Sequence, residues 1–143
     1  LFKTMKMINS MKVSEISERK LPLFIQIVLM SLLIQKSVAI HQIPALYFFF
    51  VAGLISTVTT FILLFLKLKA SLHMIGICAL TIFVIGLSVY FHTNSLYLIA
   101  FLTLMIGFVA SSRLEMNAHT FRELIYGIYI GVIPQIIVLW FWL

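Results

Sequence analysis

The sequence predicts an all-α fold, a polytopic bundle of about five transmembrane helices that forms a single domain over residues 1–143. Two observations predict it. Hydrophobic residues make up 63% of the chain and charged residues only 10%, which is a composition typical of membrane proteins. The apolar residues are also gathered in long runs, and about 20 such residues in a helix cross the hydrocarbon core of a bilayer.

Five apolar runs are long enough, or nearly so, to cross a membrane as helices. Gln26, Gln35 and Lys36 interrupt the first run, the second is the most uniformly apolar, and the fourth is short. Trp140 and Trp142 near the end of the fifth run are typical of interfacial anchors. The expected spans are 21–40, 44–66, 73–91, 95–111 and 121–143.

The segment before the first run, residues 1–20, mixes apolar side chains with Lys3, Lys6 and Lys12. This mixture predicts an amphipathic helix that lies on the membrane surface. The alternative is that these residues are the tail of an earlier spanning helix. Farther along, we expect five of the glycines in the apolar runs to let helices pack closely. They are Gly76, Gly86, Gly107, Gly127 and Gly131.

Counting the crossings places the polar stretches of the chain on one side of the membrane. Residues 1–20, the 67–72 loop and the 112–120 loop share a side, whereas the loops around His41 and Asn94 lie on the other. Almost all cations belong to the first side, and only Lys36 belongs to the second. This asymmetry favours a cytoplasmic location for the first side. The excess of Lys and Arg over Asp and Glu also favours anionic headgroups or phosphorylated ligands as partners, and not nucleic acid.

The shared side carries residue types suited to phosphate chemistry. Lys12, Arg19 and Arg113 offer permanent positive charge, and the arginine fork fits two phosphate oxygens at once. The hydroxyls of Ser71 and Ser112 add hydrogen-bond donors. Fixed cations and aimed donors stabilise the charge of a phosphoryl group during its transfer.

Two histidines on the same side permit a two-step displacement, in which one imidazole attacks phosphorus and the other protonates the departing alkoxide. These are His73 and His119, and Glu123 follows His119 by four residues. Positions i and i+4 share a helix face, so this carboxylate is placed to orient the ring. The alternative for either histidine, taken alone, is a structural role as a polar residue at a helix boundary.

The three stretches resemble the signature of the type 2 phosphatidic acid phosphatase (PAP2) superfamily, in the form of a divergent short bacterial member. The family pattern is K-x6-RP, PSGH and SR-x5-H-x3-D. The corresponding residues here are Lys12-x6-Arg19, Ala70-Ser71-Leu72-His73 and Ser112-Arg113-x5-His119-x3-Glu123. The chain departs from the pattern at Ala70, Leu72 and Glu123, and its proline is displaced to Pro22.

The resemblance implies a role for each matching residue. His119 would be the nucleophile, His73 the general acid and Glu123 the orienting carboxylate, while Lys12, Arg19, Ser71, Ser112 and Arg113 would bind phosphate. It further implies a six-span core, and therefore a further portion before residue 1. The site would face the periplasm of a bacterial cell membrane, in conflict with the charge asymmetry.

The sequence therefore predicts a multi-pass lipid phosphate phosphatase that forms a phosphohistidine and uses no cofactor. No His, Cys and carboxylate set has the spacing of a zinc site, and acidic residues are too few for magnesium. The alternative is a non-catalytic phospholipid-binding or transport protein of the same ancestry, and a third possibility is a structural membrane subunit.

Two further expectations concern charged residues around the motifs. Lys67 and Lys69 are expected to extend toward lipid headgroups, with contact to the substrate phosphate as the alternative for Lys69. The carboxylates of Glu15, Glu18 and Glu115 are expected to pair with nearby cations.

Overall fold

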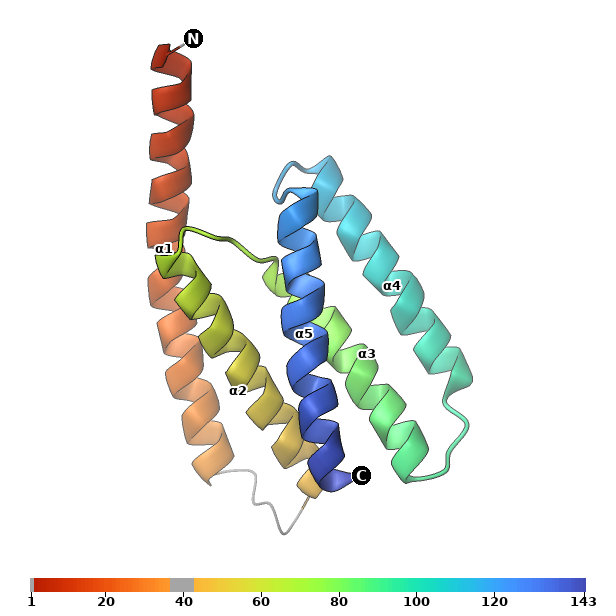
Figure 1. Cartoon of the computed structure of the whole chain (residues 1–143). Helices are drawn as coiled ribbons and strands as arrows, with labels where there is room; N and C mark the ends of the chain where they lie inside the picture. The colour runs from red at the N-terminus through yellow and green to blue at the C-terminus, as the bar shows by residue number, and fades with distance from the viewer. Residues whose placement is uncertain (1, 37–42) are drawn as a thin grey trace.

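The computed structural model describes residues 2–36 and 43–143, without the side chains of residues 2, 3, 5 and 7–14. It contains five helices, and no strand occurs in the described residues (Figure 1). The all-α fold is therefore confirmed. The helices are α1 (Phe2–Lys36), α2 (Pro44–Phe65), α3 (Leu72–Tyr90), α4 (Leu96–Glu115) and α5 (Phe121–Trp142).

Four helices, α2 to α5, are long and apolar enough to cross a membrane. Their bounds lie close to the expected second to fifth spans, and they indicate a multi-pass membrane protein. The expected first span is not one of these four helices, because its apolar part is only the second half of α1. Residues 37–40 of that expected span lie outside the described residues. Large apolar side chains such as Phe108 and Ile137 are exposed on the bundle, as suits a surface that contacts lipid.

The first helix differs from the expected arrangement. We expected a surface segment over residues 1–20 and a separate span after it, but α1 runs without a break over 35 residues. Pro22 lies inside this helix. In Figure 1 the first half of α1 projects beyond the other helices. The second half packs against α2, where Leu23 and Leu64 belong to one buried cluster with Ile16.

The closest packing in the bundle is between α3 and α5. A Cβ atom at Gly131 would lie 2.6 Å from the carbonyl oxygen of Ile75, and one at Gly127 would lie 2.9 Å from that of Ser71. A Cβ atom at Gly86 would also be too close to a neighbour, the side chain of Leu139. These three glycines confirm the expected close packing, and the pair at 127 and 131 serves contact within one chain. At Gly76 and Gly107 the expectation was wrong, because a Cβ atom added there would have no neighbouring atom of the described residues within 4 Å.

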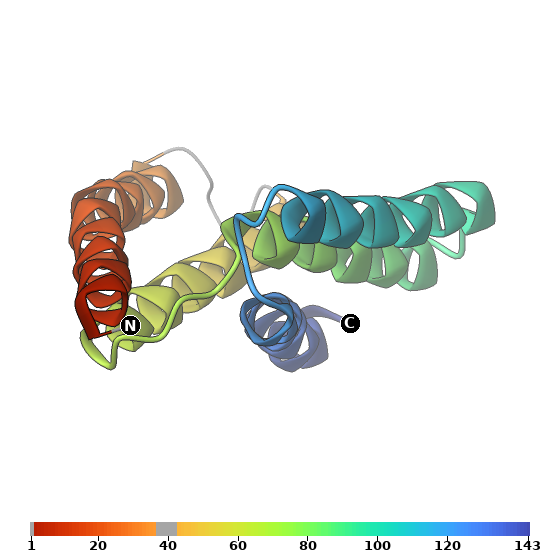
Figure 2. The ribbon, with the colours of Figure 1, turned by 90° about the horizontal axis from the view of Figure 1, so that it is seen from above.

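Hydrogen bonds join α2 to α5 within the apolar bundle. The Ser56 hydroxyl donates to the Ile130 carbonyl at 2.8 Å, and the Gln135 amide donates to the Phe49 carbonyl at 3.3 Å. Viewed from above, α1 and α4 lie at opposite edges of the molecule, with α4 alongside α3 (Figure 2). The centre of the fold is therefore α2, α3 and α5, and the outer helices are α1 and α4.

The expected sharing of one side by the polar stretches is borne out in the arrangement of the bundle. The first half of α1, the connection 66–71 and the connection 116–120 lie toward the same end (Figure 1). The α3–α4 connection and the C-terminus lie toward the other end. We call the first of these the polar end.

Candidate functional site

The turn from α4 to α5 explains the spacing between Arg113 and His119. Asn117 adopts a left-handed conformation with φ 51°, and the Ala118 backbone N–H donates to the Arg113 carbonyl at 3.1 Å. The Asn117 N–H donates to the Leu114 carbonyl at 3.0 Å. Together these bonds form a Schellman motif, which ends a helix and satisfies its last carbonyls. The His119 N–H also donates to the Arg113 carbonyl, at 3.4 Å, so the backbone of one candidate residue positions the other.

This turn corrects the expected extent of the loop. We expected Ser112 and Arg113 to lie in a loop over 112–120, but both belong to the last turns of α4, which ends at Glu115. The Arg113 side chain is therefore aimed by a helix and not by a flexible segment.

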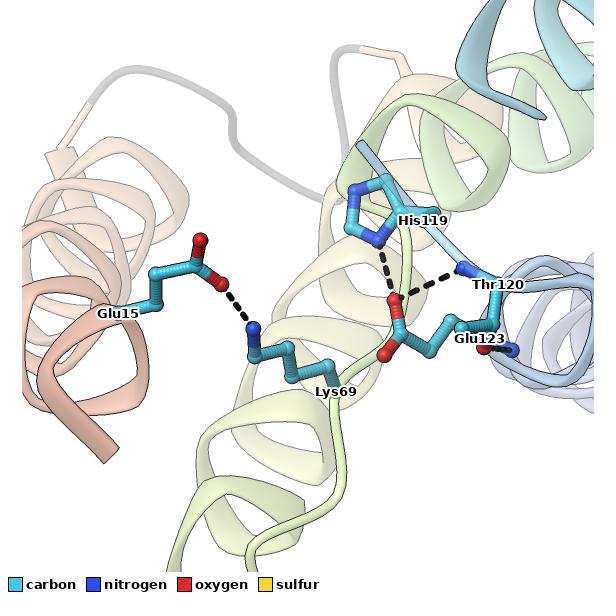
Figure 3. Close-up of polar contacts among 5 residues, drawn as sticks. All are labelled: Glu15, Lys69, His119, Thr120 and Glu123. Atoms are coloured by element: carbon cyan, nitrogen blue, oxygen red, sulfur yellow. Dashed lines mark hydrogen bonds and ion pairs between the residues drawn. The ribbon is translucent and has the colours of Figure 1, made fainter. Parts of the chain in front are cut away.

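The start of α5 fixes the His119 ring. Thr120 caps the helix, and its hydroxyl accepts from the Glu123 N–H at 3.4 Å. The Glu123 carboxylate accepts from the Thr120 N–H at 3.3 Å and lies 2.9 Å from His119 Nδ1 (Figure 3). This reciprocal arrangement is a capping box. When Nδ1 carries the proton and donates to Glu123, Nε2 of His119 has a free lone pair.

Ser71 joins the start of α3 to the start of α5. Its backbone N–H donates to the Glu123 carbonyl at 3.2 Å, and the absence of a side chain at Gly127 lets α5 approach this closely. The Ser71 hydroxyl is fully buried and has no hydrogen-bond partner in the described part of the chain. A buried hydroxyl without a partner costs about 1–3 kcal/mol, so it is a position where a ligand atom would be favoured.

The cations of the outer helices converge on the same region. Arg113, His119 and Arg19 are close enough to influence the His73 imidazole. The Nε atom of Arg113 is buried and, among the described residues, has no hydrogen-bond partner. Arg19 lines a cleft of about 280 Å³ together with Leu72 and Gln26. The arrangement therefore offers two imidazoles, two guanidinium groups and a buried hydroxyl at one end of the bundle.

Most of the expected site residues are brought together, but not all. Hydrogen bonds join His119, Glu123, Ser71 and Arg113 at the polar end. His73 and Arg19 lie at the same end, where Arg19 and Arg113 are near enough to influence the His73 imidazole. Ser112 is exposed, and its hydroxyl contacts Met116 of the same helical end at 3.9 Å. No described contact joins Ser112 to the other site residues. The side chain of Lys12 lies outside the described residues, although its backbone belongs to α1.

Sequence reasoning placed Lys69 among residues that reach toward headgroups, and this was wrong. Lys69 is only 7% exposed, and its ammonium group pairs with the Glu15 carboxylate of α1 (Figure 3). The expected pairing of Glu15 with a cation is confirmed. The hydrogen bond and charge of Lys69 hold the pKa of Glu15 below its usual value of 4.5. The two residues are far apart in sequence, so no local spacing could have revealed the pair.

Within the described residues, no three His, Cys, Asp or Glu side chains gather in a way that could hold a metal ion. No family model, curated protein or solved structure matches the chain. The resemblance to the PAP2 superfamily therefore rests on the three motifs alone.

Proposed function

We propose that this chain is an integral membrane lipid phosphate phosphatase that hydrolyses a phosphate monoester or pyrophosphate through a phosphohistidine intermediate. The observation that carries this proposal is the 2.9 Å contact between His119 Nδ1 and Glu123. This contact leaves Nε2 available. In the described structure two buried donors, Ser71 Oγ and Arg113 Nε, have no partner, and the backbones of these two residues are hydrogen-bonded to Glu123 and His119. A nucleophile whose partner orients it, next to unused donors, is a recurrent feature of covalent catalysis.

In the first step of the proposed mechanism, His119 Nε2 attacks phosphorus and the P–O bond to the leaving group breaks. His73 gives its proton to the departing oxygen. In the second step a water molecule loses a proton to His73 and attacks phosphorus, so that the N–P bond breaks and inorganic phosphate is released. Arg19, Arg113 and Ser71 stabilise the charge on the phosphoryl oxygens, and Glu123 stabilises the positive charge on the His119 ring.

A lipid substrate is favoured by the position of the site at one end of four apolar helices. The cleft that Arg19 lines shares Gln26 and Leu72 with a deeper cavity of about 140 Å³. This cavity lies among α1, α2, α3 and α5, and its apolar lining includes Met30, Phe50 and Ile75. A headgroup beside Arg19 could thus continue into an acyl or prenyl chain between the helices. Phosphatidate-like, phosphatidylglycerol-phosphate, prenyl-diphosphate and lipid A phosphate substrates all fit this description.

The proposal includes a location in a bacterial cell membrane. The PAP2 resemblance favours a periplasmic active site, whereas the distribution of cations favours the cytoplasmic side. Labelling of a cysteine introduced at Asn94, in a chain that lacks Cys78, would distinguish the two, because Asn94 lies between α3 and α4 at the end opposite the site.

A second candidate is a non-catalytic protein that binds or transports phospholipids. It is favoured by Leu72, whose side chain lines the cleft beside Arg19 where the family signature has glycine. A bulky residue there narrows the space for a substrate in line with His119, while leaving the cations free to hold a headgroup.

The test is phosphate release from a panel of these lipid phosphates by the purified protein in detergent, with EDTA present. We expect release in EDTA, and we expect His119→Ala to abolish it. The matched control is His92→Asn, because His92 lies at the opposite end with φ 51°, a conformation that asparagine tolerates. Full activity in His119→Ala would refute the mechanism, and lipid binding without turnover in the folded wild type would favour the second candidate.

The leaving-group dependence of His73→Ala tests the other half of the mechanism. A general acid contributes about 10²–10⁴-fold when the leaving group needs a proton. We therefore expect a loss of this size with alkyl phosphates and a much smaller loss with p-nitrophenyl phosphate, measured as kcat/KM. Equal losses with both substrates would remove His73 from the role of general acid.

A further inference from the structure

Lys69 is a buried cation immediately before the candidate site. It precedes Ala70 and Ser71 on the connection into α3, and its side chain is only 7% exposed. A buried charge needs a partner, because removing it from water is costly. Its partner is Glu15 of α1, whose side chain is 57% exposed. One member of the pair is therefore buried, and the other lies largely in solvent.

Glu15 has basic neighbours from three separate elements. Lys69 comes from the α2–α3 connection, and it forms the hydrogen bond and ion pair. Arg19, one turn farther along α1, and the imidazole of His119, before α5, are also near enough to influence the Glu15 carboxylate. Two of these three groups, Arg19 and His119, are assigned above to phosphate binding and catalysis. The carboxylate of Glu15 therefore occupies a place where an anion meets the cations of the site.

The two partners also line different clefts. Glu15 lines the cleft of about 280 Å³ with Arg19 and Leu72. Lys69 lines a cleft of about 180 Å³ with Thr120 and Glu123 at the start of α5. The Lys69 stem is flexible and its ammonium group can turn to a new acceptor, and from its position before Ser71 that acceptor can be a phosphate in the site.

We propose that Glu15 is an internal competitor of the phosphate ligand, which holds Lys69 in the unliganded protein and gives it up when a phosphate group binds. This inference rests on the proposed function, because it concerns the same site. It makes Lys69 a further phosphate-binding residue, and it makes Glu15 a residue that sets how tightly the site binds. A phosphate dianion carries more charge than a carboxylate and can contact Lys69, Arg19 and Arg113 together, so it can displace Glu15.

The test is binding of inorganic phosphate to the purified full chain in detergent, measured by isothermal titration calorimetry. We expect Glu15→Gln to tighten the Kd for phosphate about 5- to 100-fold, a range typical of coupled sites. The matched control is Glu18→Gln, which removes the same charge from the same cleft and should change the Kd less than about twofold, as is usual for an exposed charge. The same titration with dihexanoyl phosphatidate distinguishes a lipid headgroup from free phosphate as the preferred ligand.

Lys69 variants complete a double-mutant cycle. Lys69→Met should weaken phosphate binding and should cancel the gain in affinity from Glu15→Gln. Lys69→Arg keeps the charge and should preserve that gain, and it serves as the second variant where Met is not tolerated at the buried position. Equal Kd changes in Glu15→Gln and Glu18→Gln would overturn the inference while leaving the proposed function intact. The absence of phosphate binding in every folded variant would overturn both.

Discussion

The candidate site draws its residues from two differently held parts of the bundle. The central helices α3 and α5 meet almost backbone to backbone at Gly127 and Gly131, and they carry or adjoin both histidines. The outer helices α1 and α4 pack chiefly against one neighbour each, α2 and α3, and they supply Arg19 and Arg113. Leu102 is the one residue of α4 that is buried in the described structure, whereas α5 has buried residues from Leu124 to Val138.

The difference assigns separate tasks to the two parts. Groups that react must keep a fixed geometry, and closely packed backbones provide it. Cations that surround a phosphate need less precision, because charge acts over distance, and they can follow the ligand as it binds. The histidines therefore belong on the central pair, and the arginines can belong on helices with fewer contacts.

The largest expected effect comes from adding one methyl group to the central contact. In Gly131→Ala the new Cβ would meet the Ile75 carbonyl and Cα, which are backbone atoms that cannot turn away. We expect a loss of about 1–3 kcal/mol in the free energy of unfolding, the usual cost of overpacking. Unfolding in detergent, followed by circular dichroism, measures it.

The matched variant on an outer helix is Gly107→Ala. Among the described residues, no neighbouring atom lies within 4 Å of a Cβ added at Gly107. Alanine is favoured over glycine in a helix interior by up to about 1 kcal/mol. We therefore expect a gain in stability, opposite in sign to the loss at Gly131. If both variants lost stability equally, the contrast between central and outer helices would not hold.

The turn that links an outer helix to the central one gives the next effect. Asn117 has φ 51°, and a β-branched side chain in this conformation costs about 1–2 kcal/mol. Asn117→Val should lose that stability, and it should also lower kcat because the turn holds His119 against the Arg113 carbonyl. Asn117→Gly should keep both properties. Loss of activity in the glycine variant as well would show that the asparagine side chain, and not the backbone conformation, is required.

The sequence predicted the all-α fold and the gathering of the polar stretches at one end of the bundle, for physical reasons that particular residues illustrate. The apolar runs reveal α2 to α5 because lipid requires long uninterrupted apolar helices. His119 and Glu123 meet as predicted, but His119 precedes the N-cap Thr120, so the capping box brings them together and not a shared helix face. Their spacing is local, so it can be seen in sequence.

Contacts between distant segments could not be predicted in this way. The pair of Glu15 and Lys69 depends on how α1 docks against the α2–α3 connection, and the open surroundings of Gly76 and Gly107 depend on which helix faces they occupy. The continuous α1 was missed because a change from polar to apolar residues resembles a boundary in sequence, although the backbone hydrogen bonds of a helix continue through it.

The smallest expected effect concerns the attachment of the outer helix α1 at the polar end. Lys69 lowers the pKa of Glu15 below 4.5 in the folded protein, so the ion pair contributes stability above that ordinary value. This contribution is lost as the pH falls through the lowered pKa, because the carboxylate then takes up a proton. The free energy of unfolding of the wild type should therefore exceed that of Glu15→Gln at neutral pH, and the two values should become similar in acid.

Water around the half-exposed Glu15 screens this pair, so its contribution should be smaller than the effects at Gly131 and Asn117, and added salt should reduce it further. The free energy of unfolding, measured across pH at low and high salt, separates the effect of Glu15 protonation from the effect of screening. A difference between wild type and Glu15→Gln that persisted unchanged in acid would mean that the glutamate holds α1 by packing and not by charge. Packing would then hold the outer helix α1 as it holds the central pair. The division between histidines in fixed positions and cations that can adjust would no longer apply to α1.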